Sequence, residues 1–148
     1  MTTLEELKNS IAEKLCNRRY EILGLVEQTR DKNGFVLRNL NSGYTFNPIT
    51  YSQDILIFFV INGLITISKS KIFPLPVQMV VLTDDYNDIP LVIEALDAYD
   101  FLPVEASLDS QQIYDKYFEI DVNKPFQGYG MELNLSIKIN YKELFIND

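Results

Sequence analysis

The 148-residue sequence contains no histidine, no tryptophan and only one cysteine, Cys16. Histidine is the side chain best suited to proton transfer near neutral pH, and none is present to activate Cys16 as a nucleophile. A single cysteine excludes an internal disulfide and a zinc site built from several cysteines, and it suits the reducing cytoplasm. Glycine-rich phosphate loops and nucleophile motifs are also absent. The sequence therefore predicts no catalytic residue, no cofactor and no metal site, and we expect a protein that is not an enzyme.

Basic residues are few, because 13 Lys and Arg stand against 21 Asp and Glu and give a net charge of −8. This balance disfavours binding to nucleic acid, where Lys and Arg neutralise phosphates. The longest apolar run, residues 55–67, is interrupted by Asn62, Gly63 and Thr66 and is shorter than the ~20 residues of a spanning helix. No secretory signal pattern opens the chain. We expect one soluble domain over residues 1–148, without a membrane partner.

The clearest pattern is the strict alternation of apolar and polar residues from Met131 to Lys142. Side chains of a strand point to opposite faces with a period of two, so this run predicts a strand with one apolar and one polar face. Residues 20–28 and 35–40 flank Asn33-Gly34, which is typical of a hairpin. Residues 55–67 and 77–82 predict a second hairpin, connected through residues 69–76, and residues 114–122 predict another strand.

Two helices are expected. Leucine and isoleucine recur at helical spacing over residues 4–17, after a possible capping box of Thr3 and Glu6, and Cys16 lies at the edge of this apolar stripe. The alternative for Cys16 is a reactive thiol. Asp88 as N-cap and Pro90 in the first turn predict a second helix over residues 88–99. The fold class is therefore α+β, in the order α-β-β-β-β-α-β-β, with a largely antiparallel sheet of about six strands and both helices on one face.

An acidic cluster, Asp84, Asp85 and Asp88, precedes the second helix. Carboxylates could hold a hard cation, but the cluster lacks the glycine and the distal glutamate of an EF-hand loop. Acidic residues at this position are explained by the helix dipole. We therefore interpret the cluster as a cap and not as a metal site.

Candidate interface residues lie in two segments. The polar stretch of residues 41–53 predicts a long surface loop, and aromatic side chains on such loops either contact partners or fold back over the sheet edge. In residues 55–67 every position of the first half is apolar, whereas the second half alternates, so sheet surface remains for a neighbouring subunit. The candidates are Tyr44, Phe46, Tyr51, Ile65 and Ile67.

The last two-thirds of the chain resembles the tail terminator (tail completion) proteins of long-tailed bacteriophages in the order and pattern of its elements. These elements are an amphipathic N-terminal helix, the hairpin of residues 55–67 and 77–82, the acidic-capped helix, the strand of residues 114–122 and the last strand after Gly128-Tyr129-Gly130. The hairpin of residues 20–40 and its loop are additional to the simplest members.

The resemblance implies a hexameric ring that closes the tail tube and joins it to the head. Tail tube and neck proteins would be its partners, DNA would pass without specific binding, and the protein would be assembled in the host cytoplasm and reside in the virion. An acidic lumen would keep the DNA backbone from adhering. Two alternatives remain open: another neck, tube or baseplate component, and a small acidic immunity or inhibitor protein that binds a basic partner as a monomer. A small-ligand or enzymatic α+β domain would instead need an apolar pocket.

Overall fold

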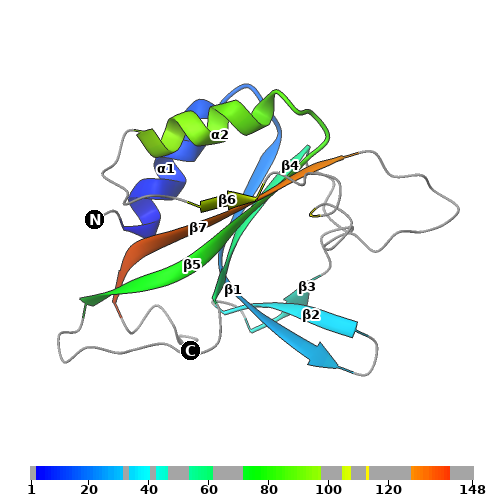
Figure 1. Cartoon of the computed structure of the whole chain (residues 1–148), viewed down its shortest axis with the longest axis vertical. Coiled ribbons are helices and arrows are strands. Elements are labelled where there is room, and N and C mark those ends of the chain that lie inside the picture. The colour runs from blue at the N-terminus through cyan, green and yellow to red at the C-terminus, as the bar shows by residue number, and fades with distance from the viewer. Residues whose placement is uncertain are drawn as a thin grey trace, which may run out of the picture.

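The computed structural model describes residues 3–31, 34–40, 43–46, 54–61, 72–97, 105–107, 113 and 128–140. Helices α1 and α2 lie together on one face of a sheet that contains all the described strands (Figure 1). The helices are α1 (Leu4–Lys14) and α2 (Asp88–Asp97). The strands are β1 (Tyr20–Asp31), β2 (Gly34–Asn39), β3 (Thr45–Phe46), β4 (Ile55–Ile61), β5 (Ile72–Thr83), β6 (Glu105–Ser107) and β7 (Tyr129–Asn140).

The sheet has seven described strands in the order β3-β2-β1-β4-β5-β7-β6. All neighbouring pairs are antiparallel except β1 and β4, which run parallel and join the two predicted hairpins into one sheet. This arrangement confirms the predicted α+β class, the largely antiparallel sheet and the placement of both helices on one face. The parallel pairing was not predicted, because it joins strands that are distant in the sequence.

Helix α1 begins after Thr3, whose Oγ1 accepts a hydrogen bond from the Glu6 amide at 3.2 Å. This is the predicted N-cap contact, and it satisfies one of the free amides of the first turn. The helix ends at Lys14, and not at Asn17 as predicted, because Leu15 is already the C-cap. Cys16 therefore follows the helix and is exposed. The prediction that Cys16 lies at the edge of the apolar stripe is wrong.

Helix α2 packs beside α1 through buried Val92, Ala95 and Leu96. Ser10 of α1 is also buried, and its hydroxyl donates to the carbonyl of Ala95 at 3.0 Å. A buried hydroxyl is costly without such a partner. This bond links the two helices above the sheet.

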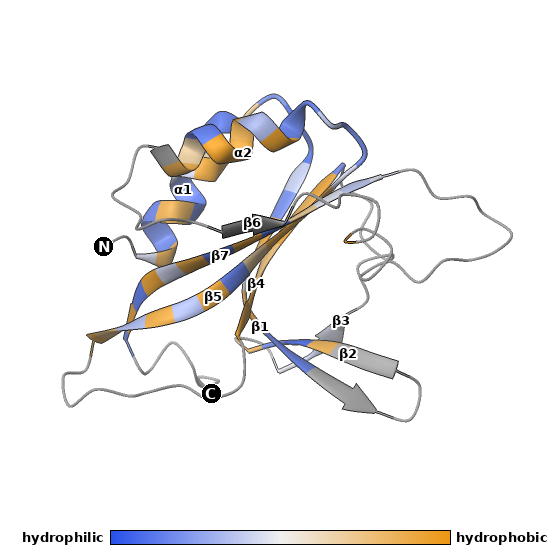
Figure 2. Ribbon diagram, viewed as in Figure 1, coloured by the Kyte–Doolittle hydropathy of each residue, from blue (hydrophilic) through white to orange (hydrophobic). Residues whose placement is uncertain are grey.

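The sheet has an apolar core on each face. The core beneath the helices contains the odd-numbered residues of the central strands, and Figure 2 shows the resulting alternation along β7. Its β7 members are Met131, Leu133, Leu135, Ile137 and Ile139, as the alternation predicted. The core on the opposite face consists of Leu23, Val26, Leu37, Leu56, Phe58, Val60, Val80, Leu82 and Ile113.

None of the described members of this second core comes from β7, whose face away from the helices is polar, as predicted. Glu132 is on that face and is only 8 % exposed, although Asn134 and Lys138 farther along are exposed. All residues from Ile55 to Val60 are buried by the two cores of this one chain. The expectation that this half of the segment leaves sheet surface for a neighbouring subunit is therefore wrong.

A register shift in β1 changes which of its residues face each core. Ile22 pairs with Ile57 and Leu25 with Phe59, so β1 has one residue more than β4 across this step. Such a bulge reverses which side chains face each side. Ile22 and Leu25 therefore both pack toward the helices, although their numbers differ in parity.

Strand β5 is longer than predicted and includes Pro74 and Pro76, which were expected in a connection because proline cannot donate to a ladder. These prolines pair in register with Lys138 and Ser136 of β7. On the other side of β5, pairing with the described part of β4 ends at Val77. Two prolines at a spacing of two direct both nitrogens to the same side of β5, so the missing donors fall on one side of the strand.

Two short strands lie where the sequence predicted no strand. β3 pairs with β2 inside the expected loop of residues 41–53, and β6 pairs with β7 inside an expected polar connection. Strands of two or three residues carry too little periodicity to be detected. The predicted strand at residues 114–122 lies outside the described residues, as do Asn33 of the first turn and residues 62–67 of the predicted longer hairpin strand.

Candidate interaction surface

A polar cluster forms where β1 and β4 begin and β5 ends. Arg18 Nη2 lies 2.9 Å from Asp84 Oδ1 and 3.1 Å from Asp88 Oδ2. The Asp88 side chain is only 3 % exposed, and it also accepts a hydrogen bond of 2.6 Å from the Thr83 hydroxyl. The buried carboxylate thus has both a charge partner and a neutral donor, which offsets its desolvation.

A second arginine extends this cluster toward solvent. Arg19 forms a two-point contact with Asp54, with Nη2 at 2.8 Å from Oδ1 and Nε at 3.2 Å from Oδ2. This hydrogen bond with Arg19 lowers the pKa of Asp54 below its ordinary 3.8, against a smaller opposing effect of desolvation. The same bond raises the pKa of Arg19. Burial lowers the pKa of Arg18, but the hydrogen bond and charge of Asp88, with Asp84 and Asp54, outweigh it and raise the pKa overall.

The predicted acidic cap has a different role in the structure. Asp88 is the first residue of α2 rather than the residue before it, and its carboxylate is occupied by Thr83 and Arg18. Asp85 instead accepts a hydrogen bond of 3.0 Å from the Asn87 amide. Among the described residues, no three His, Cys, Asp or Glu side chains converge to hold a metal ion. The N-cap prediction for Asp88 is wrong. Its carboxylate binds Arg18 instead, a residue that is distant in the sequence and that no local pattern could identify.

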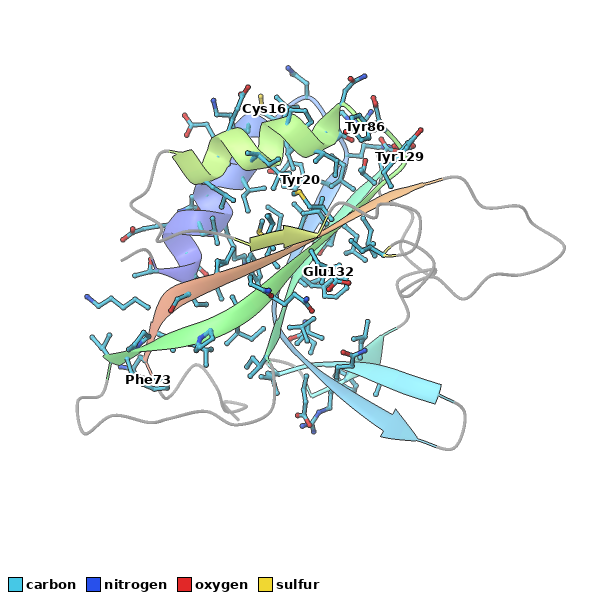
Figure 3. All side chains as sticks on the ribbon, viewed as in Figure 1. Cys16, Tyr20, Phe73, Tyr86, Tyr129 and Glu132 are labelled. Atoms are coloured by element: carbon cyan, nitrogen blue, oxygen red, sulfur yellow. The ribbon has the colours of Figure 1, made fainter. Side chains whose placement is uncertain are left out.

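Two tyrosines lie next to this cluster. Tyr86 is in the turn between β5 and α2, and Tyr129 opens β7 opposite Thr83. Their rings meet edge to face, with centroids 5.4 Å apart and an interplanar angle of 73° (Figure 3). Tyr86 is 58 % and Tyr129 39 % exposed. Exposed tyrosines are enriched at protein interfaces, so this pair is a candidate contact surface.

Of the predicted interface residues, the structure describes the side chain of Tyr44, which is 78 % exposed. Tyr44 directly precedes edge strand β3, and its carbonyl accepts a hydrogen bond of 2.9 Å from the Asn39 amide. The preceding residue, Gly43, has a positive φ of 75°. Phe46 belongs to β3 and pairs with Leu37. Tyr51, Ile65 and Ile67 lie outside the described residues.

Tyr86 and Tyr129 are not among the interface residues predicted from the sequence. Both are aromatic residues in a loop-like sequence context, which is the feature that made Tyr44 a candidate. Tyr86 lies among Asp and Asn residues, and Tyr129 lies between Gly128 and Gly130. The structure brings Tyr86 and Tyr129 together, although 43 positions separate them, and places Tyr44 at the other end of the strand order. The described exposed tyrosines thus form two separate surfaces.

Comparisons with known protein families, with characterised protein sequences and with solved structures returned no match. None of the described helices has the length and apolar character needed to cross a membrane. The chemistry that the described surface offers is that of binding, through tyrosine rings and paired charges.

Proposed function

We propose that the protein is a structural component of a bacteriophage tail, a non-enzymatic subunit that assembles into a hexameric ring, terminates the tail tube and joins it to the neck. The proposal combines the resemblance in element order with the geometry of the exposed aromatic side chains. DNA would pass through this ring without specific binding.

The main support is that the exposed tyrosines belong to strands far apart in the order of one sheet. Tyr44 adjoins β3, the first strand in the order, whereas Tyr129 opens β7, the last but one. A ring requires two different surfaces on each subunit, so that the first surface of one copy meets the second surface of the next. A subunit with exposed tyrosines on such distant strands offers two different surfaces.

Charge gives further support. The helix layer presents exposed Glu5, Glu6, Glu13 and Glu94, and its Lys8 and Lys14 are within ion-pair distance of Glu5 and Glu94. An excess of carboxylates repels the phosphate backbone. This fits a subunit beside which DNA slides.

The test is analytical ultracentrifugation of the purified protein at high concentration, with and without tail tubes. We expect hexamers, ring-shaped particles in electron micrographs, and co-sedimentation with tail tubes. A persistent monomer that ignores tail tubes and binds one basic protein would overturn the proposal in favour of an immunity or inhibitor protein.

A further inference from the structure

We infer that copies of this chain associate head to tail, with the Tyr86–Tyr129 surface of one copy receiving the β2–β3 edge of the next. The inference rests on the proposed ring and names its interface. The receiving surface consists of Tyr86, Tyr129 and the adjoining Asp84. The inserted edge consists of β2, β3 and the exposed Tyr44.

The receiving surface carries excess negative charge. Its polar cluster contains two arginines, Arg18 and Arg19, and four aspartates, Asp54, Asp84, Asp85 and Asp88. The arginines are engaged with Asp54, Asp84 and Asp88 within the same subunit, so they do not cancel all the carboxylates. Asp84 remains 58 % exposed in its side chain despite its contact with Arg18. The field beside the two tyrosines therefore attracts a cation.

The β2–β3 edge presents an arginine among its described residues. In the sequence, residues 27–53 carry three basic and two acidic side chains, whereas the remainder carries ten basic and nineteen acidic ones. Arg38 of β2 pairs in register with Thr45 and is 41 % exposed, although it also contacts Glu27. Tyr44 directly precedes Thr45 in the chain, and both tyrosine and arginine are enriched in the energetically dominant part of interfaces.

The two surfaces complement each other in charge and in chemistry. An arginine placed over a tyrosine ring gains a cation–π contact, and nearby carboxylates strengthen the attraction. The two surfaces are different and lie far apart in the strand order, so a head-to-tail contact leaves one surface of each copy free for a further copy. Repeated contacts must then close into a ring or continue as a filament.

The experiment uses two full-length variants that each lose one surface. Tyr86→Ser/Tyr129→Ser removes the receiving rings, and Tyr44→Asp places a charge of the wrong sign on the inserted edge. Each variant alone should self-associate about tenfold or more weakly than the wild type in sedimentation velocity. Circular dichroism checks that each variant is folded. Ile93→Ser is the matched control, because Ile93 on α2 is 40 % exposed and belongs to neither surface; its association should equal that of the wild type.

Mixing the two variants is the decisive step. The double-serine variant retains a good β3 edge and the Tyr44→Asp variant retains good receiving tyrosines, so a one-to-one mixture should form heterodimers that do not grow. Higher salt should weaken these dimers, because exposed charges are screened. Unchanged assembly of either variant alone, a mixture that stays monomeric, or a wild type that stays monomeric at high concentration would overturn the inference.

The result also separates this interface from the proposed function. Heterodimers from a protein that ignores tail tubes would leave the interface standing and remove the tail function. If both variants still form rings that bind tail tubes, the tail function stands and the interface is ruled out.

Discussion

Arg18 donates a hydrogen bond from Nη2 to Oδ2 of Asp88 over 3.1 Å, joining residues that are 70 positions apart. The arginine follows helix α1 and the aspartate begins helix α2. Since the aspartate is buried, the pair ties the junctions of both helices to the end of β5, where Thr83 also contacts Asp88. The same tie positions the turn that carries Tyr86.

Replacing Arg18 should therefore destabilise the fold. Arg18→Met leaves the buried Asp88 carboxylate with Thr83 as its remaining described side-chain donor, and we expect a loss of about 1–3 kcal/mol in the free energy of unfolding. Urea unfolding followed by circular dichroism measures this loss. Arg19→Met is the control, because Arg19 is 72 % exposed and its pair with Asp54 is open to solvent. Equal losses in the two variants would contradict the assigned role of Asp88.

Truncation of the helix-facing side of β7 should be costly. Ile137 is fully buried in the core beneath the helices, so Ile137→Ala should lower the free energy of unfolding by about 2–5 kcal/mol. Leu135→Ala should behave similarly. Asn134→Ala on the opposite face of the strand, where the side chain is exposed, should change the free energy by less than about 0.5 kcal/mol. A small effect at Ile137 would mean that the core face is misassigned.

Phe58 and Phe59 test whether the sheet has two cores. They are neighbours on β4, both with 0 % exposure, and they belong to opposite cores. Phe58→Ala and Phe59→Ala should each cost about 3–5 kcal/mol, because each leaves a cavity. Chemical denaturation of the two variants gives the comparison. A loss confined to Phe59→Ala would show that the face away from the helices is open to solvent.

The Arg19–Asp54 pair predicts part of the acid dependence of stability. The folded-state pKa of Asp54 is lowered below 3.8, so its contribution is present above this pH and is lost as the pH falls through the folded-state pKa. The stability difference between wild type and Asp54→Asn should thus shrink as the pH falls below about 4. Thermal unfolding over a pH series measures this difference. Arg19→Met removes the same pair and should show the same trend; a constant difference in both variants would contradict this linkage.

The predicted interface residues can be tested by introducing charge. Phe46→Glu or Ile65→Glu should block ring assembly while the monomer stays folded, because an unpaired charge is costly when buried at an interface and inexpensive when exposed. Sedimentation reports assembly and circular dichroism reports folding. Ile93→Glu on the outer side of α2 is the matched control. Unchanged assembly of both variants would show that Phe46 and Ile65 do not lie in the interface.

Local patterns in the sequence predicted most elements of the fold. The alternation from Met131 onward and the helical spacing from Leu4 are backbone periodicities, so β7, α1 and their buried faces follow from the sequence. The Thr3 cap and the first hairpin depend on contacts between near neighbours, which local chemistry decides. The lack of histidine and the single cysteine are also properties of the sequence alone, and they limit the chemistry available to the folded protein.

Only the tertiary structure decided the features that depend on distant pairing. The parallel contact of β1 with β4, the bulge that changes which β1 side chains face each core, and the acceptance of Pro74 and Pro76 in β5 all depend on which strand lies alongside. Asp88 has the sequence context of a cap, but Arg18 converts it into a buried ion pair. Tyr86 and Tyr129 become one surface because β5 and β7 are paired at Thr83 and Tyr129. Backbone periodicity is a local property, whereas strand partners and charge pairs are chosen by the free energy of the whole folded chain, which no short segment contains.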